Sequence, residues 1–364
     1  MKIKKILQNI FKNIGIIVFK LIYGKVKVGH KSESNAKYVK KEISFDGCKD
    51  SYNLFTINNA RLYTDRIQDT AIIRNNIIID GASFQLRNNF NSTIDKNIVI
   101  RKGTPRFKKK LNGSILSLLT GGGGNNNFFH WFFDVLPRVG IYEKYLNLKN
   151  LNYLLCPNLN SWQLKSLELL GFNKDQLLSS VKYRHISSDI IYTTSHPWNF
   201  NSNIVNDIEN IPEWISIWLK NKFLNKKSKK IFPKRIYIDR SDSNSNLKEF
   251  RSIINEKEII EYLKKKNFEL IQLSKLNLED EIKIFNDAEI VVGLQGAGFT
   301  NLIWANNKTK IIELRSKYTN KLYQNLAKQN KIDFNFIESY PVGDTIAKHY
   351  GAINIDLEEL KKII

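Results

Sequence analysis

Apolar and polar residues follow two different periods along the second half of the chain. Short apolar runs bounded by polar residues indicate strands, whereas apolar residues that recur every three or four positions indicate amphipathic helices. The strands are expected at 235–239, 268–273, 290–292 and 310–314, and the helices at 256–266 and 278–286. Strands and helices that alternate in this way predict a parallel, doubly wound sheet, whose ligands bind outside the carboxyl ends of the strands. Residues from about 228 to 340 are therefore interpreted as a nucleotide-binding half.

In the first half of the chain, polar residues and glycine interrupt the apolar runs more often. From 43 to 100, short apolar runs alternate with Asn, Asp and Gly, which predicts strands and hairpins, with 97–100 as one of the extended runs. Longer units follow: strands at 115–119, 153–156 and 190–193, a helix from 128 and a helix at 162–170. This half is therefore also expected to be α/β, with a β-rich N-terminal leader.

These patterns divide the chain into four parts. Its 364 residues fit two domains of ordinary size. An amphipathic basic helix is expected at 1–30, an N-terminal domain at 31–225, and a C-terminal domain at 226–340. The last residues, 341–364, are expected to form a tail that packs back on the domains.

The N-terminal segment has one apolar helical stripe between residues 3 and 22. Lys2, Lys5, Lys12 and Lys20 lie on its other face, and Lys25, Lys27 and Lys31 follow. A transmembrane span needs about 20 consecutive apolar residues, whereas Lys12 and Lys20 bracket only seven uncharged ones. No small-residue cleavage site follows, as a signal peptide would require. Residues 1–27 are therefore expected to bind an anionic membrane surface; the alternative is a helix docked on the protein's own core.

The net charge and the small number of cysteines limit the classes of ligand and site that are expected. The 57 basic and 35 acidic residues give a net charge of +22, which attracts phosphorylated ligands, anionic lipid and nucleic acid alike. A nucleic-acid site at the lysine run 226–230 is the alternative to a solvated linker, and we expect no nucleic-acid partner. Cys48 and Cys156 are the only cysteines, and no Cys or His has a metal-ligand spacing. Neither a disulfide framework nor a structural zinc site is expected, which fits a cytosolic protein.

A glycine-rich turn follows the strand at 290–292. Its glycines are Gly293, Gly296 and Gly298. They allow close approach of the backbone to a ligand, and the first amides of the helix that follows can point at an anion. Their order matches neither the dinucleotide fingerprint nor the phosphate loop, so a purely structural turn stays open. Arg240 follows the first strand of this half and Glu313 ends the last, so both are expected at the same edge as the turn.

A second candidate site lies in the first half. Four glycines and three asparagines at 121–127 lead into an aromatic helix, in which His130, Asp134 and Arg138 fall at i, i+4 and i+8. The glycines suggest a mobile loop, and Asn126 or Asn127 can cap the helix. An imidazole and a carboxylate on one partly desolvated face are suited to general base catalysis. Pro137 predicts a kink or an early end of the helix that would turn Arg138 elsewhere. A packed histidine and a plain Asp134–Arg138 ion pair are the alternatives.

These segments together resemble glycosyltransferase family 61, in its bacterial capsular and exopolysaccharide type, over roughly residues 115–320. The matching residues are His130-Trp131, Asp134 and Leu136-Pro137-Arg138, then Asp239-Arg240-Ser241, Arg251 and Ile254-Asn255-Glu256, and last Gly293, Gly296-Ala297-Gly298, Thr300-Asn301 and Ile312-Glu313-Leu314. Several motifs in this order are far more specific than any one of them.

The resemblance implies a GT-B type fold, in which two Rossmann-like doubly wound domains face a cleft. It implies an inverting glycosyltransferase that moves a hexosyl or pentosyl group from a nucleotide-sugar to a glycan or lipid-linked glycan in surface polysaccharide biosynthesis. No cofactor and no metal are expected, since no Asp-x-Asp motif accompanies the nucleotide site. The expected location is the cytoplasm, peripheral at the inner face of the cell membrane.

The resemblance also implies roles for individual residues. Asp134 or His130 would be the catalytic base, with Arg138 and Trp131 contacting or supporting the acceptor. The donor would be held by Arg240, Asn255, Glu256, Gln295, Gly296, Ala297, Gly298, Asn301 and Glu313. Gln295 stands where the family often has His, and it cannot carry a proton charge. The competing function is a non-catalytic nucleotide- or glycan-binding scaffold in a polysaccharide assembly complex.

Overall fold

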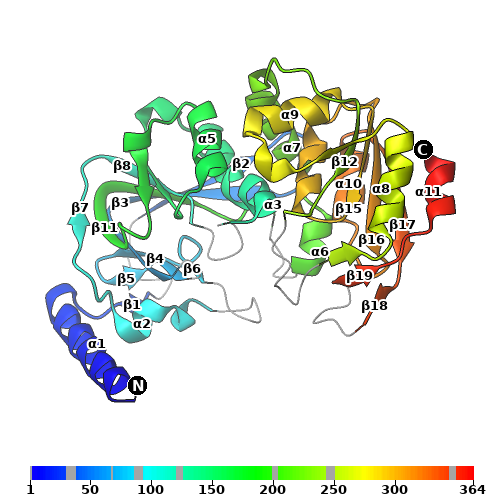
Figure 1. Cartoon of the computed structure of the whole chain (residues 1–364). Helices are drawn as coiled ribbons and strands as arrows, with labels where there is room; N and C mark the ends of the chain where they lie inside the picture. Colours follow the sequence, from blue (N-terminus) through cyan, green and yellow to red (C-terminus); the bar gives the residue numbers. More distant parts are fainter. Residues whose placement is uncertain are drawn as a thin grey trace. The chain divides into compact units, whose positions relative to one another are not determined.

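The computed structural model forms two compact units, Met1–Asn203 and Ile204–Ile364 (Figure 1). It describes residues 2–29, 38–66, 69–85, 93–119, 126–198, 204–242, 251–343 and 350–364. Lys31 and the glycines at 121–124, to which the sequence assigns roles, lie outside the described residues.

The first unit is built on a large mixed sheet. Its strands are β1 (Lys27–Val28), β2 (Val39–Ser44), β3 (Ser51–Arg66), β4 (Asp69–Arg74), β5 (Ile77–Ile78), β6 (Phe84–Gln85), β7 (Lys109–Lys110), β8 (Ser114–Ser117), β9 (Tyr153–Cys156), β10 (Leu177–Ser179) and β11 (His185–Thr194). The order is β1-β5-β4-β3-β11-β8-β9-β10, with β2 on β3, β6 on β4 and β7 on β11. Strands β11, β8, β9 and β10 are parallel, and β3 is antiparallel to β11, β4 and β2. The α/β class is confirmed, and the β-rich leader contributes its strands to this sheet.

The helices described in the first unit are α1 (Lys2–Tyr23), α2 (Ile98–Lys102), α3 (Phe128–His130), α4 (Pro137–Glu143) and α5 (Ser161–Leu169). Between α3 and α4 lies the π-helical turn η2 (Trp131–Val135), and the short turn η1 (Ile94–Lys96) comes before α2. Two more short turns are η3 (Leu148–Asn150) and η4 (Lys174–Gln176). The expected extended run at 97–100 is wrong. Asn97 caps α2 instead, because its side chain accepts a hydrogen bond from the amide of Val99 at 3.2 Å.

Local sequence accounts for the hairpin between β4 and β5. Asn75 and Asn76 both have positive φ, 48° and 61°, and the flanking pairs are Arg74 with Ile77 and Ile73 with Ile78. A two-residue turn of this kind requires left-handed backbone at both positions, which asparagine tolerates.

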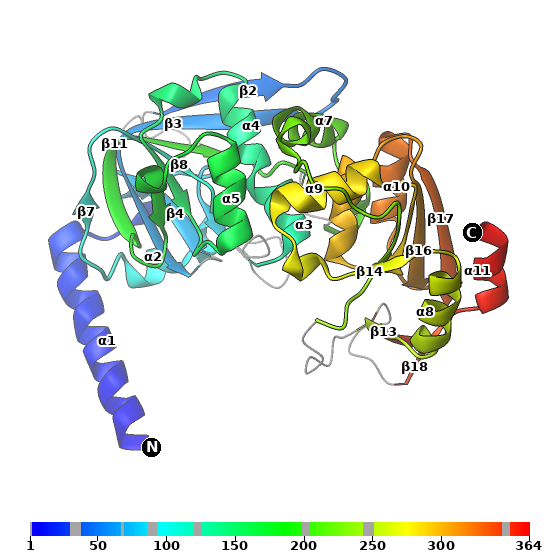
Figure 2. The same cartoon turned by 45° about the horizontal axis from the view of Figure 1, so that its top comes forward.

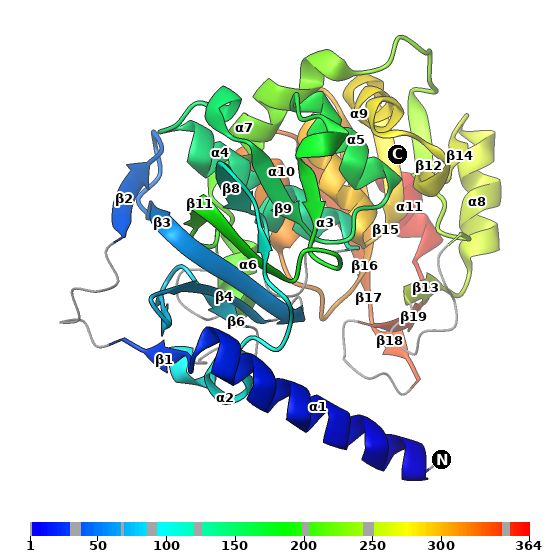
Figure 3. The ribbon, with the colours of Figure 1, turned by 90° about the vertical axis from the view of Figure 1, so that its left-hand side faces the viewer.

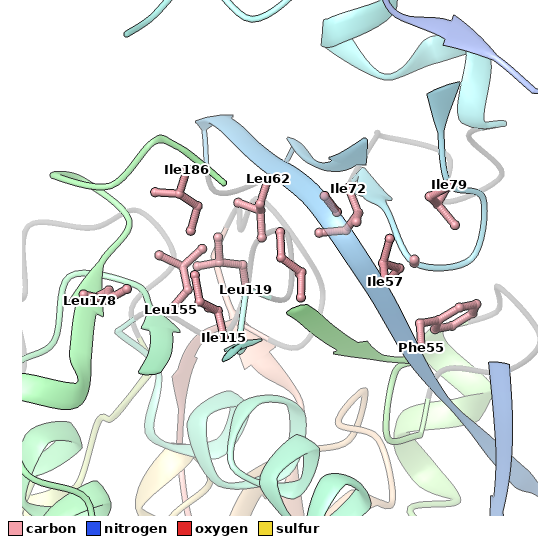
Figure 4. Close-up of a cluster of buried hydrophobic side chains, with 13 residues drawn as sticks. Phe55, Ile57, Leu62, Ile72, Ile79, Ile115, Leu119, Leu155, Leu178 and Ile186 are labelled. Atoms are coloured by element: carbon pink, nitrogen blue, oxygen red, sulfur yellow. The ribbon is translucent and has the colours of Figure 1, made fainter. Parts of the chain in front are cut away.

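The core of the first unit gathers apolar side chains from β3, β4 and β8–β11 (Figure 4). They include Phe55, Ile57, Leu62, Ile72, Ile115, Leu155 and Ile186, all nearly inaccessible to solvent. Because these strands come from distant parts of the sequence, this cluster fixes the sheet on which Trp198 and the other described residues after β11 are placed.

The second unit contains a parallel sheet of five strands. They are β12 (Arg235–Ile238), β14 (Glu269–Ile271), β15 (Ile290–Leu294), β16 (Lys310–Ser316) and β17 (Asp333–Ser339), in the order β14-β12-β15-β16-β17. Every neighbouring pair is parallel, so the predicted doubly wound sheet is confirmed here. The order reverses between β12 and β15, and ligands of such sheets bind outside the carboxyl ends at this point.

Helices connect these strands on both faces of the sheet. The connections through α8 (Glu256–Lys265) and α9 (Leu278–Asp287) run in opposite directions along the sheet, so right-handed crossovers place them on opposite faces. Figure 2 shows α8 beside α11 (Leu357–Ile363), and their apolar residues share a core with the sheet. The helices η7 (Ala297–Trp304) and α10 (Leu322–Gln329) follow β15 and β16.

The end of the chain belongs to the second unit. Strands β13 (Arg251–Ile253), β18 (Pro341–Val342) and β19 (Gly351–Ile353) form a small sheet in the order β13-β19-β18. Ile353, Ile355 and Leu360 are buried in the same core as the central strands. The segment 341–364 therefore contributes both strands and core residues to this unit.

Residues 204–225, which the sequence pattern assigns to the N-terminal domain, lie in the second unit. They form α6 (Ile204–Glu209), α7 (Glu213–Phe223) and the turn η5 (Leu224–Lys226). The side chain of Asn325 donates to the carbonyl of Glu209 at 2.7 Å, and the ring of Phe223 lies edge-on to Trp304. The pattern alone could not give this boundary, because an amphipathic helix does not show which core its apolar face covers.

Candidate functional site

The helix that carries His130 stays continuous past Pro137. Asn127 caps it, since its side chain accepts from the amide of His130 at 3.2 Å. The amide of Leu136 then bonds the carbonyl of Trp131, five residues back, so one turn is widened into η2. Pro137 becomes the first residue of α4, where its missing N–H costs nothing. The kink or early end of the helix that Pro137 predicts is replaced by this π-turn, a feature that often occurs at functional sites.

His130 and Asp134 form a hydrogen-bonded pair on this helix. His130 Nδ1 lies 2.8 Å from Asp134 Oδ2, and the exposed fractions of the two side chains are 29% and 7%. With Asp134 ionised, Nδ1–H donates to the carboxylate and leaves Nε2 as the basic atom. The i, i+4 relation predicted from the sequence brings the two groups together, and the imidazole is the more accessible.

The electrostatics of the pair favour a basic imidazole. Burial lowers the pKa of His130, but the hydrogen bond to Asp134 and the negative charge of that carboxylate outweigh burial and raise the pKa above its ordinary value. The histidine is thus a stronger base than a free imidazole and is held in one tautomer.

Two further residues at this site were missed by the sequence analysis. The indole Nε1 of Trp198 donates to Asp134 Oδ1 at 2.7 Å, and His196 Nε2 lies 3.8 Å from Asp134 Oδ2. Both follow β11, which is parallel to β8, the strand that comes before α3 in the chain. A His and a Trp directly after a parallel strand were the available signal, because the carboxyl ends of parallel neighbours share one edge.

Arg138 and Trp131 are buried residues of the same helical segment as His130 and Asp134. Arg138 is 2% exposed; its Nε donates to the carbonyl of Asp134 at 3.1 Å and its Nη1 to the carbonyl of Thr194 at 3.0 Å. It thereby ties α4 to the end of β11. Trp131 is fully buried and donates from Nε1 to the hydroxyl of Ser166 at 2.8 Å. Both residues support the site from within the core.

In the second unit, Arg240 and the glycine turn meet at the point where the strand order reverses. Arg240 Nη1 donates to the carbonyl of Gln295 at 3.1 Å, which joins the carboxyl ends of β12 and β15. Asp239 shapes the turn that carries Arg240, because its carboxylate accepts from the amide of Ser241 at 2.8 Å and from Gln272 Nε2 at 2.9 Å. The convergence expected from the strand pattern is confirmed for these two segments.

The glycines of the turn provide room for neighbouring side chains. A Cβ on Gly296 would lie 3.1 Å from the guanidinium of Arg240, one on Gly293 would lie 3.0 Å from Ile238, and one on Gly298 would lie 2.9 Å from Leu273. None of the three lies in the left-handed region, and Gly296 is extended with φ 171°. The first hydrogen bond within η7 joins the amide of Phe299 to the carbonyl of Gly296. The amides of Ala297 and Gly298 come before it, at the end of the helix where backbone N–H groups can bind a ligand.

A second arginine lies at this edge. Arg251, on β13, directs Nη1 at the same carbonyl of Gln295 at 3.4 Å. Burial and the charge of Arg251 lower the pKa of Arg240, and burial also lowers that of Arg251. The side-chain oxygen of Gln295 is buried and has no hydrogen-bond partner among the described residues. Two like charges and a buried acceptor at one edge suit a ligand that carries both anionic and donor groups.

Four residues expected to hold the donor make hydrogen bonds within the second unit. Asn301 is fully buried between Glu281 and Trp304, and both ends of its side chain are used. Asn255 exchanges two hydrogen bonds with the backbone of Ile355. The other two are Glu256, which accepts from the hydroxyl of Tyr237 at 2.6 Å, and Glu313, which is 1% exposed and pairs with Arg315 at 3.2 Å. Asn301 and Glu313 are buried, whereas Asn255 and Glu256 are partly exposed, and a donor contact by any of the four stays a prediction.

The buried Glu281 predicts a pH dependence of stability. Burial raises the pKa of its carboxyl to about 8, against the smaller lowering effect of the Asn301 amide. Stability from a raised acid is fully present below the unfolded pKa and is lost as pH rises through the folded one. Glu281→Gln should flatten the fall in unfolding free energy between about pH 5 and pH 8, a change on the order of 1 kcal/mol per pH unit. Denaturant unfolding followed by fluorescence at several pH values measures this slope.

Glu313, whose pKa burial raises to about 7, contributes to the slope in both proteins, so a reduced slope is expected and not its complete loss. Glu261→Gln, on the exposed side of α8, should leave the slope unchanged. An unaltered slope in Glu281→Gln would contradict the assignment.

Within the described ranges, no group of three or more His, Cys, Asp or Glu side chains is placed to hold a metal ion. No curated protein matches the chain. The model of the family described as glycosyltransferase 61 matches residues 128–312, just over half of the chain. The match begins two residues before His130 and includes Asp134, Arg240, Arg251 and the glycine turn. The two clusters that the structure assembles around Asp134 and around the carbonyl of Gln295 therefore fall within one recognised domain, and the chain belongs to the glycosyltransferase 61 family, whose activity is the transfer of a sugar from a donor to an acceptor.

Proposed function

We propose that this protein is an inverting glycosyltransferase that moves a hexosyl or pentosyl group from a nucleotide-sugar to a glycan or lipid-linked glycan, in the biosynthesis of a surface polysaccharide such as a capsule. The observation that carries the proposal is the contact between His130 Nδ1 and Asp134 Oδ2 at 2.8 Å. It supplies a base that is partly exposed and held in one orientation.

His130 is the general base of the proposed reaction, and Asp134 orients it. Both carboxylate oxygens of Asp134 already accept hydrogen bonds, one from Trp198 and one from His130. The carboxylate is nearly inaccessible to solvent, whereas Nε2 of the imidazole points away from the pair. This division of roles follows the general logic of an imidazole base positioned by a buried carboxylate.

The proposed step is a single displacement. Nε2 of His130 takes the proton of the acceptor hydroxyl while that oxygen forms a bond to the anomeric carbon of the donor sugar. The bond from the anomeric carbon to the phosphate oxygen breaks, and its electron pair leaves with the nucleoside diphosphate. One displacement inverts the anomeric configuration, and Asp134 stabilises the imidazolium that forms.

The second unit is proposed to hold the donor. The guanidinium groups of Arg240 and Arg251 and the amides of Ala297 and Gly298 would meet the diphosphate, and Gln295 would accept from a ribose hydroxyl or a base N–H. Two guanidinium groups and a helix N-terminus supply positive charge where the leaving group becomes more negative. The proposed reaction therefore does not depend on a bound metal ion and uses no cofactor.

The proposed arrangement of the two units is of the GT-B type, with the acceptor on the first unit and the donor on the second. The proposed location is the cytoplasm. The free thiols of Cys48 and Cys156 fit a reducing compartment.

A screen of the purified protein against nucleotide-sugars, with EDTA present and cell-derived glycans as acceptors, tests the proposal. Release of a nucleoside diphosphate together with a glycosylated product is the expected result, and nuclear magnetic resonance of the product reports the anomeric configuration. Retention of configuration, or turnover that stops with EDTA and returns with a divalent cation, would overturn the proposed mechanism. Nucleotide binding without any turnover would favour the scaffold function.

A further inference from the structure

Figure 3 shows α1 projecting from the first unit, with its carboxyl-terminal end beside β1 and α2. Nine large apolar side chains between Ile6 and Ile22 are 44% to 82% exposed, with Phe11 and Leu21 the most exposed. The alternative that this stripe docks on the protein's own core is therefore wrong. A helix with an uncovered apolar stripe of this width needs an apolar partner.

The carboxyl-terminal end of α1 is fixed to the first unit, and this fixes the direction of the stripe. The hydroxyl of Tyr23 accepts from the amide of Lys108 at 2.9 Å, and its ring lies edge-on to His185 at 4.9 Å. Arg61 Nη2 donates to the carbonyl of Tyr23 at 3.3 Å, and Lys20 Nζ donates to the carbonyl of Arg101 at 2.8 Å. The side chains of Lys20 and Tyr23 lie on the face of α1 that contacts the first unit. The apolar stripe therefore points outward.

The segment 101–110, which runs from the last residues of α2 through β7, lies against the same helix. Phe107 is 79% exposed and makes an edge contact with Phe19 of α1, with ring centroids 5.0 Å apart. The segment also carries six basic residues, which are Arg101, Lys102, Arg106, Lys108, Lys109 and Lys110, and no acidic one. An exposed aromatic ring beside a run of cations is typical of protein that binds an anionic membrane.

A groove of about 800 Å³ lies between part of α1 and this segment. Lys12, Lys102 and Arg106 line it together with the apolar side chains of Phe11 and Ile16, and no carboxylate is among its lining residues. Three cations beside an apolar wall match a lipid phosphate and the first part of an acyl chain. The groove is therefore complementary in charge and polarity to an anionic phospholipid.

We propose that α1 and the segment 101–110 form one membrane-binding surface, in which the α1 stripe and Phe107 enter the interface of an anionic bilayer and Lys12, Lys102 and Arg106 hold a lipid phosphate. By length and composition, Ile6–Tyr23 is also the one helix among the described residues that could span a membrane. An interfacial position fits better, because a span would carry Lys12 into the hydrocarbon core, at considerable cost. This surface would hold the protein on an anionic membrane, and the proposal does not depend on the reaction proposed above.

Co-sedimentation of the full chain with two kinds of vesicle tests the proposal, one of phosphatidylcholine alone and one of phosphatidylcholine with phosphatidylglycerol. Preferred binding to the anionic vesicles is expected. The double variant Lys102→Glu, Arg106→Glu should weaken it by about tenfold or more, and Phe107→Ser by a smaller factor. The matched controls are Lys264→Glu with Lys265→Glu, on the exposed side of α8, and Ile231→Ser, which is 97% exposed in the second unit.

Each outcome supports or overturns the proposal. Weak binding of the 101–110 variants with full binding of the controls supports it, provided that their thermal unfolding matches the wild type. Equal losses in the controls would show that binding reflects only the net charge of +22, and this would overturn it. Equal binding to both vesicles, or none, would do the same. Retention in the membrane after alkaline carbonate extraction would identify a spanning helix instead.

Discussion

His130→Gln should lower the kcat of sugar transfer by about 10²–10⁴-fold, the range expected when a general base is removed, with little change in nucleotide affinity. The glutamine keeps a polar side chain of similar reach but cannot take the acceptor proton. His130 lies in the first unit, whereas the proposed nucleotide site lies in the second. A loss confined to kcat therefore distinguishes a catalytic base from a general defect in folding. Steady-state kinetics and calorimetric titration with the nucleotide measure the two effects.

His185→Gln is the matched control. His185 belongs to the same unit, but burial lowers its pKa to about 4, and its Nδ1 bonds the carbonyl of Arg106 beside α1. A substitution there should leave kcat unchanged. Equal losses of kcat in the two variants would contradict the assignment of His130.

The pH profile decides which member of the pair is the base. If His130 takes the proton, activity rises with pH as its imidazole becomes neutral, at a pH above the ordinary pKa of histidine. Asp134→Asn removes the hydrogen bond and the charge that raise this pKa. The acidic limb should then move to lower pH while kcat falls by about 10²-fold or more. If His130→Gln instead keeps activity with a limb at the pH of a carboxylate, Asp134 is the base.

The sequence was most informative where function depends on neighbours along one element. The i, i+4 spacing of His130 and Asp134 predicts their contact once a helix is recognised. The helix continues past Pro137 because the widened turn η2 accommodates a residue that has no backbone N–H. In the same way, the alternation of strands and helices after residue 228 predicts the edge at which Arg240 meets the glycine turn.

Residues that meet through distant strands could not be found in this way. His196 and Trp198 reach Asp134 because β11 pairs with β8, which lies some 70 residues earlier in the chain. Arg251 reaches the carbonyl of Gln295 from β13, whose partner is β19, about 100 residues later. Periodicity also does not show on which side of a turn a polar group points. Asn301, which the family resemblance assigns to the donor, lies in a buried network with Glu281 and Trp304 that this pattern does not predict.

Arg240→Ala should weaken the binding of a nucleoside diphosphate by about 10- to 150-fold, because a hydrogen bond to a charged group contributes about 1.5–3 kcal/mol. Arg251→Ala should have an effect of similar size, since both guanidinium groups are directed at the carbonyl of Gln295. Arg240→Lys should recover only part of the affinity, because an ammonium keeps the charge but loses the planar fork that matches phosphate. Calorimetric titration of each variant with a panel of nucleoside diphosphates measures the loss.

The opposite end of the same strand provides the control for this prediction. Arg235 begins β12, where its Nη1 donates to the carbonyl of Lys266 at 2.7 Å and its guanidinium lies over the ring of Phe268. Arg235→Ala removes one positive charge from the second unit but lies at the amino end of the sheet, away from the point where the strand order reverses. If Arg235→Ala weakens nucleotide binding as much as Arg240→Ala, the effect comes from net charge and the proposed donor site is wrong. If only Arg240→Ala and Arg251→Ala weaken it, the diphosphate is held at the carboxyl ends of β12 and β15.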